Sequence, residues 1–188
     1  MSTTIPDVDF LTPYVIDDFL SPIEFEAIRS LTCNEEDKNP FAYFPHKFVT
    51  SPSEVEGQSL LDVYWNWYAT HMIYKEDQPK SNLYWTFYNI IIKKFYDMKI
   101  IKSLICVKAN LYPYTENLKQ HCFHTDADYK HKGALFSINT CDGYTEFEDG
   151  TKIDSVENRI VFFDPSIPHR STTTTNAYAR FDINFNFI

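Results

Sequence analysis

Two segments in the second half of the chain alternate strictly between apolar and polar residues. They are residues 105–112 (ICVKANLY) and residues 180–188 (RFDINFNFI). Side chains of a β-strand point alternately to opposite faces, so both segments are predicted to be strands with one apolar and one polar face. Each apolar face must be covered, and each polar face must meet water or an internal cavity. The polar rows are Lys108, Asn110 and Tyr112 on the first strand, and Arg180, Asp182, Asn184 and Asn186 on the second.

Four shorter strand candidates lie between these two segments: ALFSIN, GYTEFE, TKID and RIVFFD. Asp142-Gly143 and Asp149-Gly150 are dipeptides typical of hairpin turns that need a positive φ, so residues 134–154 are predicted to form consecutive antiparallel strands. Many short strands with helices on one side indicate a mainly β fold, either a sandwich or a jelly-roll barrel.

The first hundred residues carry helical signals that would supply this cover. In FLSPIEFEAIRSL, Ser21 is the expected N-cap, Pro22 occupies the first helical position and Glu24 completes a capping box. Further helices are predicted over residues 59–74 and 81–98, and residues 34–58 are expected to be a loop with room for a short strand. We therefore expect one domain over residues 1–188, with a helical support region (1–100) and a β core (101–188).

Charge and cysteine content exclude some classes of protein. The formal net charge is -9, which argues against nucleic acid and anionic membranes as partners. The four cysteines include no CxxC pair, and the N-terminus has no basic start followed by an apolar stretch. A cytoplasmic protein with reduced thiols is the expectation.

The stretch FHTDADYKHKG contains the strongest candidate for chemistry. His124 and Asp126 are two residues apart, so on a strand both would point the same way and could hold one ion. The third ligand we predict is His169 in DPSIPHRS, where two prolines form a rigid turn after the strand RIVFFD. Two imidazoles and one carboxylate make the facial arrangement that non-haem Fe(II) oxygenases use, with coordination positions left open.

Arg180 lies eleven residues beyond His169, on the polar side of the last strand. A buried guanidinium that faces a cavity requires a carboxylate, because its planar fork offers paired, charge-assisted hydrogen bonds. A dicarboxylate co-substrate would satisfy it, and Asn110 and Tyr112 on the opening strand would supply further donors. Asp182 shares the strand face of Arg180 and could pair with the guanidinium instead.

Together, His124-x-Asp126, His169 and Arg180 in ARFDINF resemble the signature of the Fe(II)- and 2-oxoglutarate-dependent dioxygenases, over residues 102–188. DDFLSPIEFEAI is similar to the first helix of the prolyl 4-hydroxylase branch. The segment NTCDGYTEFEDGTKIDSVENRIVFFDPSIPHRS is similar to short stand-alone oxygenases encoded by viruses of cyanobacteria (cyanophages).

The resemblance implies a double-stranded β-helix with helices packed on its major sheet, and iron held by His124, Asp126 and His169. It also implies that 2-oxoglutarate chelates the metal through its 2-oxo acid end and pairs its far carboxylate with Arg180. Tyr112 matches a tyrosine that hydrogen-bonds this carboxylate in prolyl hydroxylases, and Asn110-x-Tyr112 is similar to co-substrate residues of the nucleic-acid demethylase branch. The implied reaction hydroxylates a C–H bond and consumes O2 and 2-oxoglutarate, with release of succinate and CO2 and with ascorbate as an optional reductant.

Two other classes stay open at this point: a non-redox metal-binding barrel, such as a cupin-like isomerase or lyase, and a barrel that only binds a partner. The substrate is set by rim loops, expected at residues 34–58 and 113–122. A peptidyl proline or another peptidyl residue is favoured by analogy of fold. A free amino acid or small metabolite comes second, and nucleic acid third. If the protein is viral, the host-cell cytoplasm is its expected location.

Overall fold

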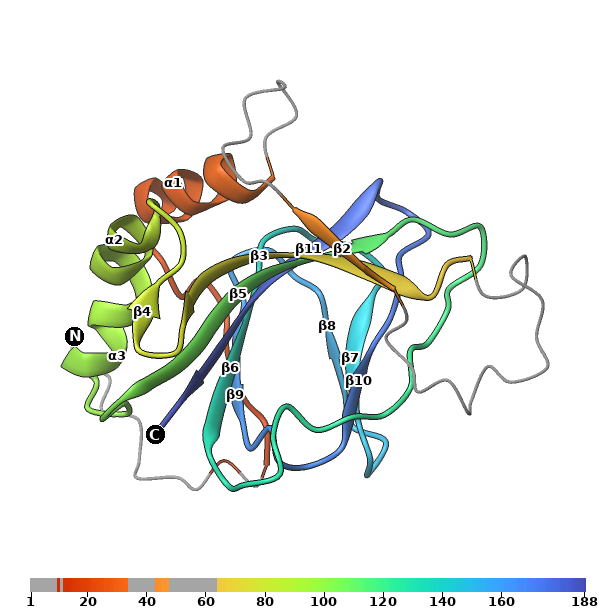
Figure 1. Ribbon diagram of the computed structural model, residues 1–188. Helices are drawn as coiled ribbons and strands as arrows, with labels where there is room; N and C mark the ends of the chain where they lie inside the picture. Colours follow the sequence, from red (N-terminus) through yellow and green to blue (C-terminus); the bar gives the residue numbers. More distant parts are fainter. Residues whose placement is uncertain (1–9, 11, 34–42, 48–63) are drawn as a thin grey trace.

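Two antiparallel sheets form the body of the protein in the computed structural model, which describes residues 10, 12–33, 43–47 and 64–188 (Figure 1). Within these residues the larger sheet has the strand order β1-β9-β6-β11-β5-β3-β2, with β4 paired to β3, and the smaller sheet has the order β10-β7-β8. The fold is the expected double-stranded β-helix, or jelly roll, and it is mainly β. The strands of the larger sheet are β1 (Tyr14–Ile16), β2 (Phe44–Lys47), β3 (Trp67–Lys75), β4 (Gln78–Pro79), β5 (Leu104–Pro113), β6 (Lys132–Ser137), β9 (Ile160–Phe163) and β11 (Ala179–Phe187), and those of the smaller sheet are β7 (Tyr144–Phe147), β8 (Lys152–Asp154) and β10 (His169–Ser171).

The two strictly alternating segments are confirmed as the neighbouring central strands β5 and β11. Their antiparallel register places Arg180 opposite Tyr112, and Asp182 opposite Asn110. Because opposite residues share a face, the two polar rows form one surface on the inner side of the larger sheet. The smaller sheet covers that side, so the space between the sheets has a polar wall (Figure 1).

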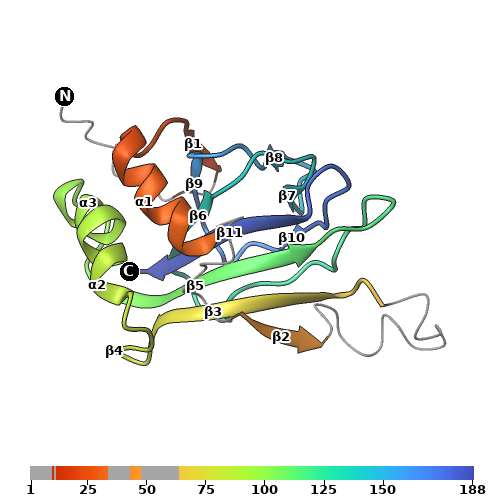
Figure 2. The ribbon, with the colours of Figure 1, turned by 90° about the horizontal axis from the view of Figure 1, so that it is seen from above.

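The helices cover the other, apolar side of the larger sheet (Figure 2). They are α1 (Pro22–Thr32) and a continuous helical run made of α2 (Tyr84–Phe87), the π-helical turn η2 (Tyr88–Ile92) and α3 (Lys93–Asp97). The predicted capping box of α1 is confirmed, with Ser21 and Glu24 each bonded to the backbone of the other. Phe95 of α3 packs its ring on those of Phe185 and Phe187, at centroid distances of 5.2 and 5.6 Å. Each buried phenylalanine contributes about 1.5–3 kcal/mol to this interface.

The prediction of a helix over residues 59–74 is wrong for residues 67–74, which belong to strand β3 in the larger sheet. Residues 59–63 lie outside the described residues, as does most of the expected loop at 34–58, in which residues 44–47 form β2. The helix predicted over 81–98 is confirmed between residues 84 and 97. The first hundred residues therefore contribute strands to the larger sheet as well as the helical cover. None of the helices formed by the described residues has the length and apolar composition needed to span a bilayer.

The two predicted hairpin turns have different outcomes. Gly150 has a φ of +86° in the turn between β7 and β8, which confirms the hairpin at Asp149-Gly150. The prediction of a second hairpin at Asp142-Gly143 is wrong, because β6 pairs with β9 and β11 and not with β7. Gly143 does not have a positive φ. It allows a close approach instead, since a Cβ there would lie 2.8 Å from Cδ of Arg180 and 2.9 Å from the carbonyl oxygen of Thr173.

Candidate metal and co-substrate site

The side chains of His124, Asp126 and His169 converge on one point between the two sheets. Nε2 of His124 and Nε2 of His169 lie 3.8 and 3.9 Å from Oδ1 of Asp126, and the three ligand atoms all lie within 4.8 Å of one another. Ligand atoms about 2 Å from one ion are roughly 3 Å apart when they are adjacent, so a contraction of about 1 Å would close the group on a metal. The side chains of Asp126 and His169 are 5% and 6% exposed, and that of His124 is 38% exposed. His124 thus lies at the mouth of the site.

Backbone hydrogen bonds bring these three residues together. His124 and His169 form an antiparallel bridge in which each backbone N–H donates to the carbonyl of the other over 2.9 Å. The N–H of Asp126 donates to the carbonyl of Pro165 over 3.0 Å, in the turn that ends with a bond from the Ile167 N–H to the Asp164 carbonyl. The proline-containing segment before His169 is therefore a turn, as the sequence predicts, and it also fixes the backbone at Asp126.

Hydrogen bonds at the far side of each ligand orient it. Nδ1 of His169 lies 2.9 Å from the carbonyl oxygen of Ile167, which leaves Nε2 directed at the site. Oδ2 of Asp126 accepts hydrogen bonds from the side-chain amides of Asn184 (3.0 Å) and Asn186 (3.1 Å), which leaves Oδ1 for a metal. Both asparagines are on the inward polar row of β11. The alternation in sequence places them on this face but indicates no role for them.

The charge states of the ligands suit a cation at neutral pH. Burial opposes ionisation of Asp126, but Lys108 and His169 nearby, together with the bond from Asn184, lower its pKa to about 2. Burial, and next the neighbouring His169, lower the pKa of His124 to about 4. A carboxylate and a neutral imidazole are the forms that coordinate metal, so no proton has to leave either group before binding.

Arg180 lies deeper between the sheets and is 1% exposed. Its Nη1 donates to the carbonyl oxygen of Tyr144 over 2.6 Å, and its Nη2 donates to Oγ1 of Thr145 over 2.8 Å. Nη2 also lies 3.4 Å from Oδ2 of Asp182, so the guanidinium has a carboxylate partner within the chain. Nε of Arg180 makes no hydrogen bond within the described part of the protein.

Asp182, Asn110 and Tyr112 surround the guanidinium. The side-chain amide nitrogen of Asn110 donates to Oδ1 of Asp182 over 2.7 Å. Two other buried oxygens, Oδ1 of Asn110 and Oδ2 of Asp182, make no hydrogen bond to any described residue. Burial raises the pKa of Asp182, although Arg180 and Asn110 act in the opposite direction. The ring centroid of Tyr112 is 5.3 Å from the guanidinium carbon, and burial raises the pKa of its hydroxyl, which stays protonated and able to donate.

A cavity of about 290 Å³ connects the metal-ligand group with this deeper polar region. Its volume is near the lower end of the roughly 300–1,000 Å³ that is usual for small-molecule sites, so it suits a small metabolite. Oδ1 of Asn110 and Oδ1 of Asn184, on two residues of its wall, are buried and make no hydrogen bond to any described residue, so they are available to a polar ligand. The cavity is lined by the three candidate metal ligands and by Tyr68, Lys108, Asn110, Tyr112, Thr125, Leu135, Thr145, Phe163, Ser171 and Asn184.

His121, for which the sequence pattern indicates no role, supports the closed end of the site. It is 1% exposed, its Nδ1 lies 2.9 Å from Oγ of Ser171, and its ring lies 5.6 Å from that of Tyr112. Burial, and next the charge of Arg180, lower its pKa to about 3. His121 is therefore a neutral packing residue behind the tyrosine.

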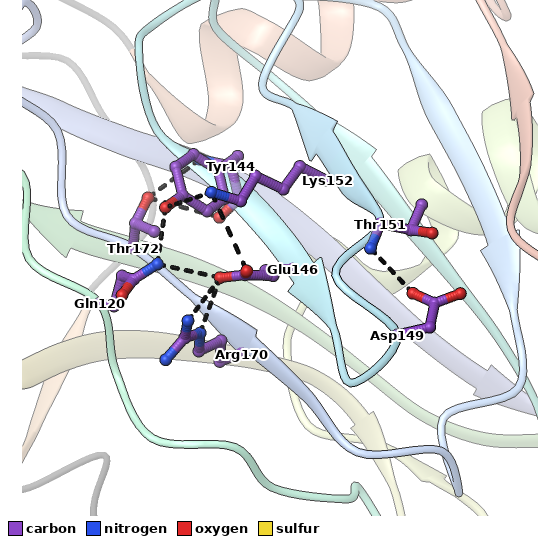
Figure 3. Close-up of polar contacts among 8 residues, drawn as sticks. All are labelled: Gln120, Tyr144, Glu146, Asp149, Thr151, Lys152, Arg170 and Thr172. Carbon is purple, nitrogen blue, oxygen red and sulfur yellow. Dashed lines mark hydrogen bonds and ion pairs between the residues drawn. The ribbon is translucent and has the colours of Figure 1, made fainter.

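Polar contacts on the outer face of the smaller sheet fix the strands whose inner face lines the site (Figure 3). Oε2 of Glu146 on β7 accepts from Nε of Arg170 on β10 over 2.8 Å and from the amide of Gln120 over 2.9 Å. Because neighbours along a strand point to opposite faces, this network on Glu146 and Arg170 directs Thr145 and His169 inward.

The chain matches no sequence-family model and no curated protein sequence. Its fold is similar to several solved structures. A prolyl-4-hydroxylase from Pseudomonas putida has a TM-score of 0.61 and 10% identity, over 99% of this chain and 97% of that one. A prolyl hydroxylase from Trichoplax adhaerens, solved with a hypoxia inducible factor peptide fragment, has a TM-score of 0.62 and 14% identity, over 98% and 87%. An oxidoreductase of the 2OG-Fe(II) oxygenase family from Burkholderia pseudomallei has a TM-score of 0.62 and 10% identity, over 93% and 84%. At this level of identity the likeness shows the fold.

Proposed function

We propose that the protein is a non-haem Fe(II)- and 2-oxoglutarate-dependent dioxygenase that hydroxylates a C–H bond of its substrate. The observation that carries the proposal is the convergence of His124, Asp126 and His169 at a cavity. Two other residues of its wall, Tyr112 and Thr145, contact the buried guanidinium of Arg180. The fold neighbours, which include prolyl hydroxylases and a 2OG-Fe(II) oxygenase, support an oxygenase as the general kind of enzyme.

The donor set fits the metal. Two imidazole nitrogens and one carboxylate oxygen on one face of an ion suit Fe(II) and leave positions for a chelating co-substrate and O2. Fe(II), once bound, would supply the activation of O2. In the overall reaction one oxygen atom of O2 enters the product and the other enters succinate, while the carboxyl group next to the keto group leaves as CO2.

The deeper polar region fits the co-substrate. The far carboxylate of 2-oxoglutarate would lie against Arg180, whose Nε has no partner among the described residues, and the hydroxyl of Tyr112 would donate to it. Oδ2 of Asp182 already forms an ion pair with Nη2 of Arg180. A second carboxylate there would repel Asp182, so we expect Asp182 to bind a proton at Oδ2 and to donate it as a hydrogen bond to the ligand. Asn110 then positions Asp182, and acts on the co-substrate through it.

A peptidyl proline or another peptidyl residue is our first choice of substrate, and a free amino acid or small metabolite is the second. The first choice rests on the resemblance in sequence and on the peptide complex of the neighbour from Trichoplax adhaerens. The acidic net charge disfavours nucleic acid. A viral origin, a cytoplasmic location and the use of ascorbate stay predictions from the sequence.

The proposal is tested by anaerobic addition of Fe(II) and 2-oxoglutarate to the full chain. We expect a weak visible charge-transfer band that needs both components, followed by slow succinate formation when O2 is admitted. His169→Ala should lose the band and the succinate, since it removes a ligand. His71→Ala is the matched control, because His71 is on β3 and bonds Ser81 rather than the site. Absence of the band and of succinate in the wild-type protein would exclude an oxygenase and favour a non-redox metal-binding barrel.

A further inference from the structure

A second cavity of about 560 Å³ adjoins the first. The two share Tyr68, Lys108 and Asp126 as wall residues. Cys106 lines only the second cavity, so passing along the inner face of β5 from Cys106 to Tyr112 leads from the second cavity into the first. The second cavity reaches the surface at Lys75, whose side chain is 54% exposed. We call it the outer cavity, and the first one the inner cavity.

Lys108 lies where the two cavities meet, next to the candidate metal ligands, since Lys108 and Asp126 line both cavities. It lies opposite Asn184 of β11, and Asn184 is bonded to Asp126. Its ammonium nitrogen is 5.9 Å from the ring centroid of Tyr68. Burial acts to lower the pKa of Lys108, but the charge of Asp126 outweighs it and the pKa is raised, so the side chain is cationic at neutral pH.

Lys108 forms no ion pair with a carboxylate of the described residues, although Asp126 influences its pKa. No described carboxylate lies within 4 Å of its Nζ, and the nitrogen makes no hydrogen bond to any described residue. Five other lysines, Lys75, Lys80, Lys93, Lys94 and Lys152, each lie within 4 Å of a carboxylate. Lys99, Lys102, Lys119 and Lys130 do not, but they are exposed to water, whereas Lys108 is partly buried. A partly buried cation without a partner is a binding group for an anion.

We infer that Lys108 binds a carboxylate of the substrate that is hydroxylated, with the rest of that substrate in the outer cavity. The inference rests on the proposed dioxygenase function. A bound metal cation would compensate the charge of Asp126, which is the carboxylate that most raises the pKa of Lys108. An anion held at Lys108 would then take over from Asp126 in keeping the buried ammonium protonated. One positive charge matches a monoanion, and the oxidised C–H bond would lie close to this carboxylate because Lys108 borders the metal site.

The co-substrate has a different cation available. Arg180 and Asn184 are four residues apart on β11, about 13 Å along the strand. Arg180 therefore lies behind Tyr112, at the part of the inner cavity away from Lys108. The far carboxylate of 2-oxoglutarate belongs at Arg180, the end away from the outer cavity. Each cation therefore serves a separate anion.

The substrate carboxylate at Lys108 could belong to a free acid, such as an amino acid, or to the side chain of Asp or Glu in a peptide. The test uses the full chain with Fe(II), 2-oxoglutarate and O2, and measures succinate formed above the uncoupled background. One arm compares the common free L-amino acids with their carboxamides. The other compares short blocked peptides that contain Asp or Glu with matched peptides that contain Asn or Gln. The arm that stimulates succinate formation assigns the source.

We expect a stimulating acid whose amide counterpart has an apparent KM at least about tenfold higher, the effect of losing one charge-assisted contact. Lys108→Met should raise the KM for that acid by a similar factor, and should change the KM for the co-substrate less than about threefold. Lys108→Arg should restore most of the affinity for the acid. Lys99→Met is the control, because Lys99 is exposed beyond the end of α3 and lines neither cavity.

Three outcomes would overturn the inference. One is stimulation by neutral compounds that is as strong as that by acids. The second is a Lys108→Met protein whose KM for the co-substrate rises as much as its KM for the acid, which would assign Lys108 to the co-substrate. The third is uncoupled succinate formation that no acid in either arm increases. In that last case the dioxygenase function would stand, whereas absence of the visible band and of uncoupled succinate would reject the function itself.

Discussion

Asn184 donates a hydrogen bond to Oδ2 of Asp126 over 3.0 Å and thereby turns Oδ1 of the same carboxylate toward His124 and His169. The strand that carries Arg180 at one end thus orients the acidic metal ligand near the other. Removal of a group that orients a metal ligand typically lowers metal affinity by about 10–100-fold.

We expect Asn184→Ala to weaken metal binding by about 10–100-fold, because the carboxylate of Asp126 would lose one of the two amides that fix it. Titration with Co(II), followed by its visible absorption, measures the affinity. Asn82→Ala, at an exposed position, is the control. Unaltered Co(II) affinity in Asn184→Ala would show that Asn186 alone orients the carboxylate.

The pairing of Arg180 with Asp182 predicts that 2-oxoglutarate binding takes up a proton. The pKa of Asp182 is already raised, chiefly by burial, and a second carboxylate beside Arg180 would raise it further. Calorimetry on the Zn(II)-loaded protein near pH 7, in buffers with different ionisation enthalpies, should report uptake of up to about one proton per ligand bound. Asp182→Asn should abolish the uptake and bind 2-oxoglutarate more tightly. Equal proton uptake by both proteins would contradict this role.

Gly143→Ala should impair the co-substrate end of the site. The added methyl group would lie 2.8 Å from Cδ of Arg180 and 2.9 Å from a backbone oxygen, so the arginine must move. We expect a loss of about 1–3 kcal/mol of stability and a KM for the co-substrate raised by about tenfold. Gly150→Ala is the control: its φ of +86° makes alanine strained, but nothing lies within 4 Å. It should lose stability with the KM unaltered, and equal KM values in all three proteins would disprove the steric effect.

His121 should make the protein less stable in acid. Its pKa is about 3 in the folded protein and about 6.5 when unfolded, so between these values the unfolded chain binds more protons. Stability from this residue is complete above about pH 6.5 and declines as the pH falls toward 3, by up to about 1.4 kcal/mol per pH unit. Urea unfolding of the wild type and His121→Asn over this range should give a shallower pH dependence for the variant. Parallel curves would mean that His121 is protonated in the folded state.

The sequence predicts well those parts of the fold that depend on local periodicity. Strands β5 and β11 follow from strict alternation, because a period of two has no helical equivalent. The helix that begins at Pro22 follows from its capping box. The alternation also predicts that Asn110, Tyr112 and Arg180 share a face, as the register of the two strands confirms.

Strand β3 could not be predicted from an alternation of apolar and polar residues. Its sequence, WYATHMIYK, mixes aromatic and apolar residues without alternation, and two adjacent residues, Ala69 and Thr70, are both buried. Both faces of β3 carry aromatic and apolar side chains, so its residues do not separate into one apolar and one polar row, as those of β5 and β11 do. Its aromatic content was the available signal, because aromatic residues favour strands over helices.

The roles of Lys108 and Asn184 could not be predicted for a different reason. The pattern places both on the inward row, but which polar side chain reaches which neighbour depends on the register between β5, β11 and the segment that contains Asp126. That register is a tertiary property. The pairing of Gly143 with Arg180 is hidden for the same reason, since the two residues are 37 positions apart (180 − 143) and meet only across the sheets.

The main-chain hydrogen bonds between His124 and His169 hold the two residues side by side whether or not a metal ion is bound. The two imidazoles are spaced by the backbone of the β-fold, so their spacing is set when the chain folds and does not have to be created by an incoming ion. Metal binding would then cost little conformational entropy, because the backbone at both histidines is already ordered. The metal-free protein should therefore stay folded, and it should bind any divalent ion of suitable size without first rearranging its backbone.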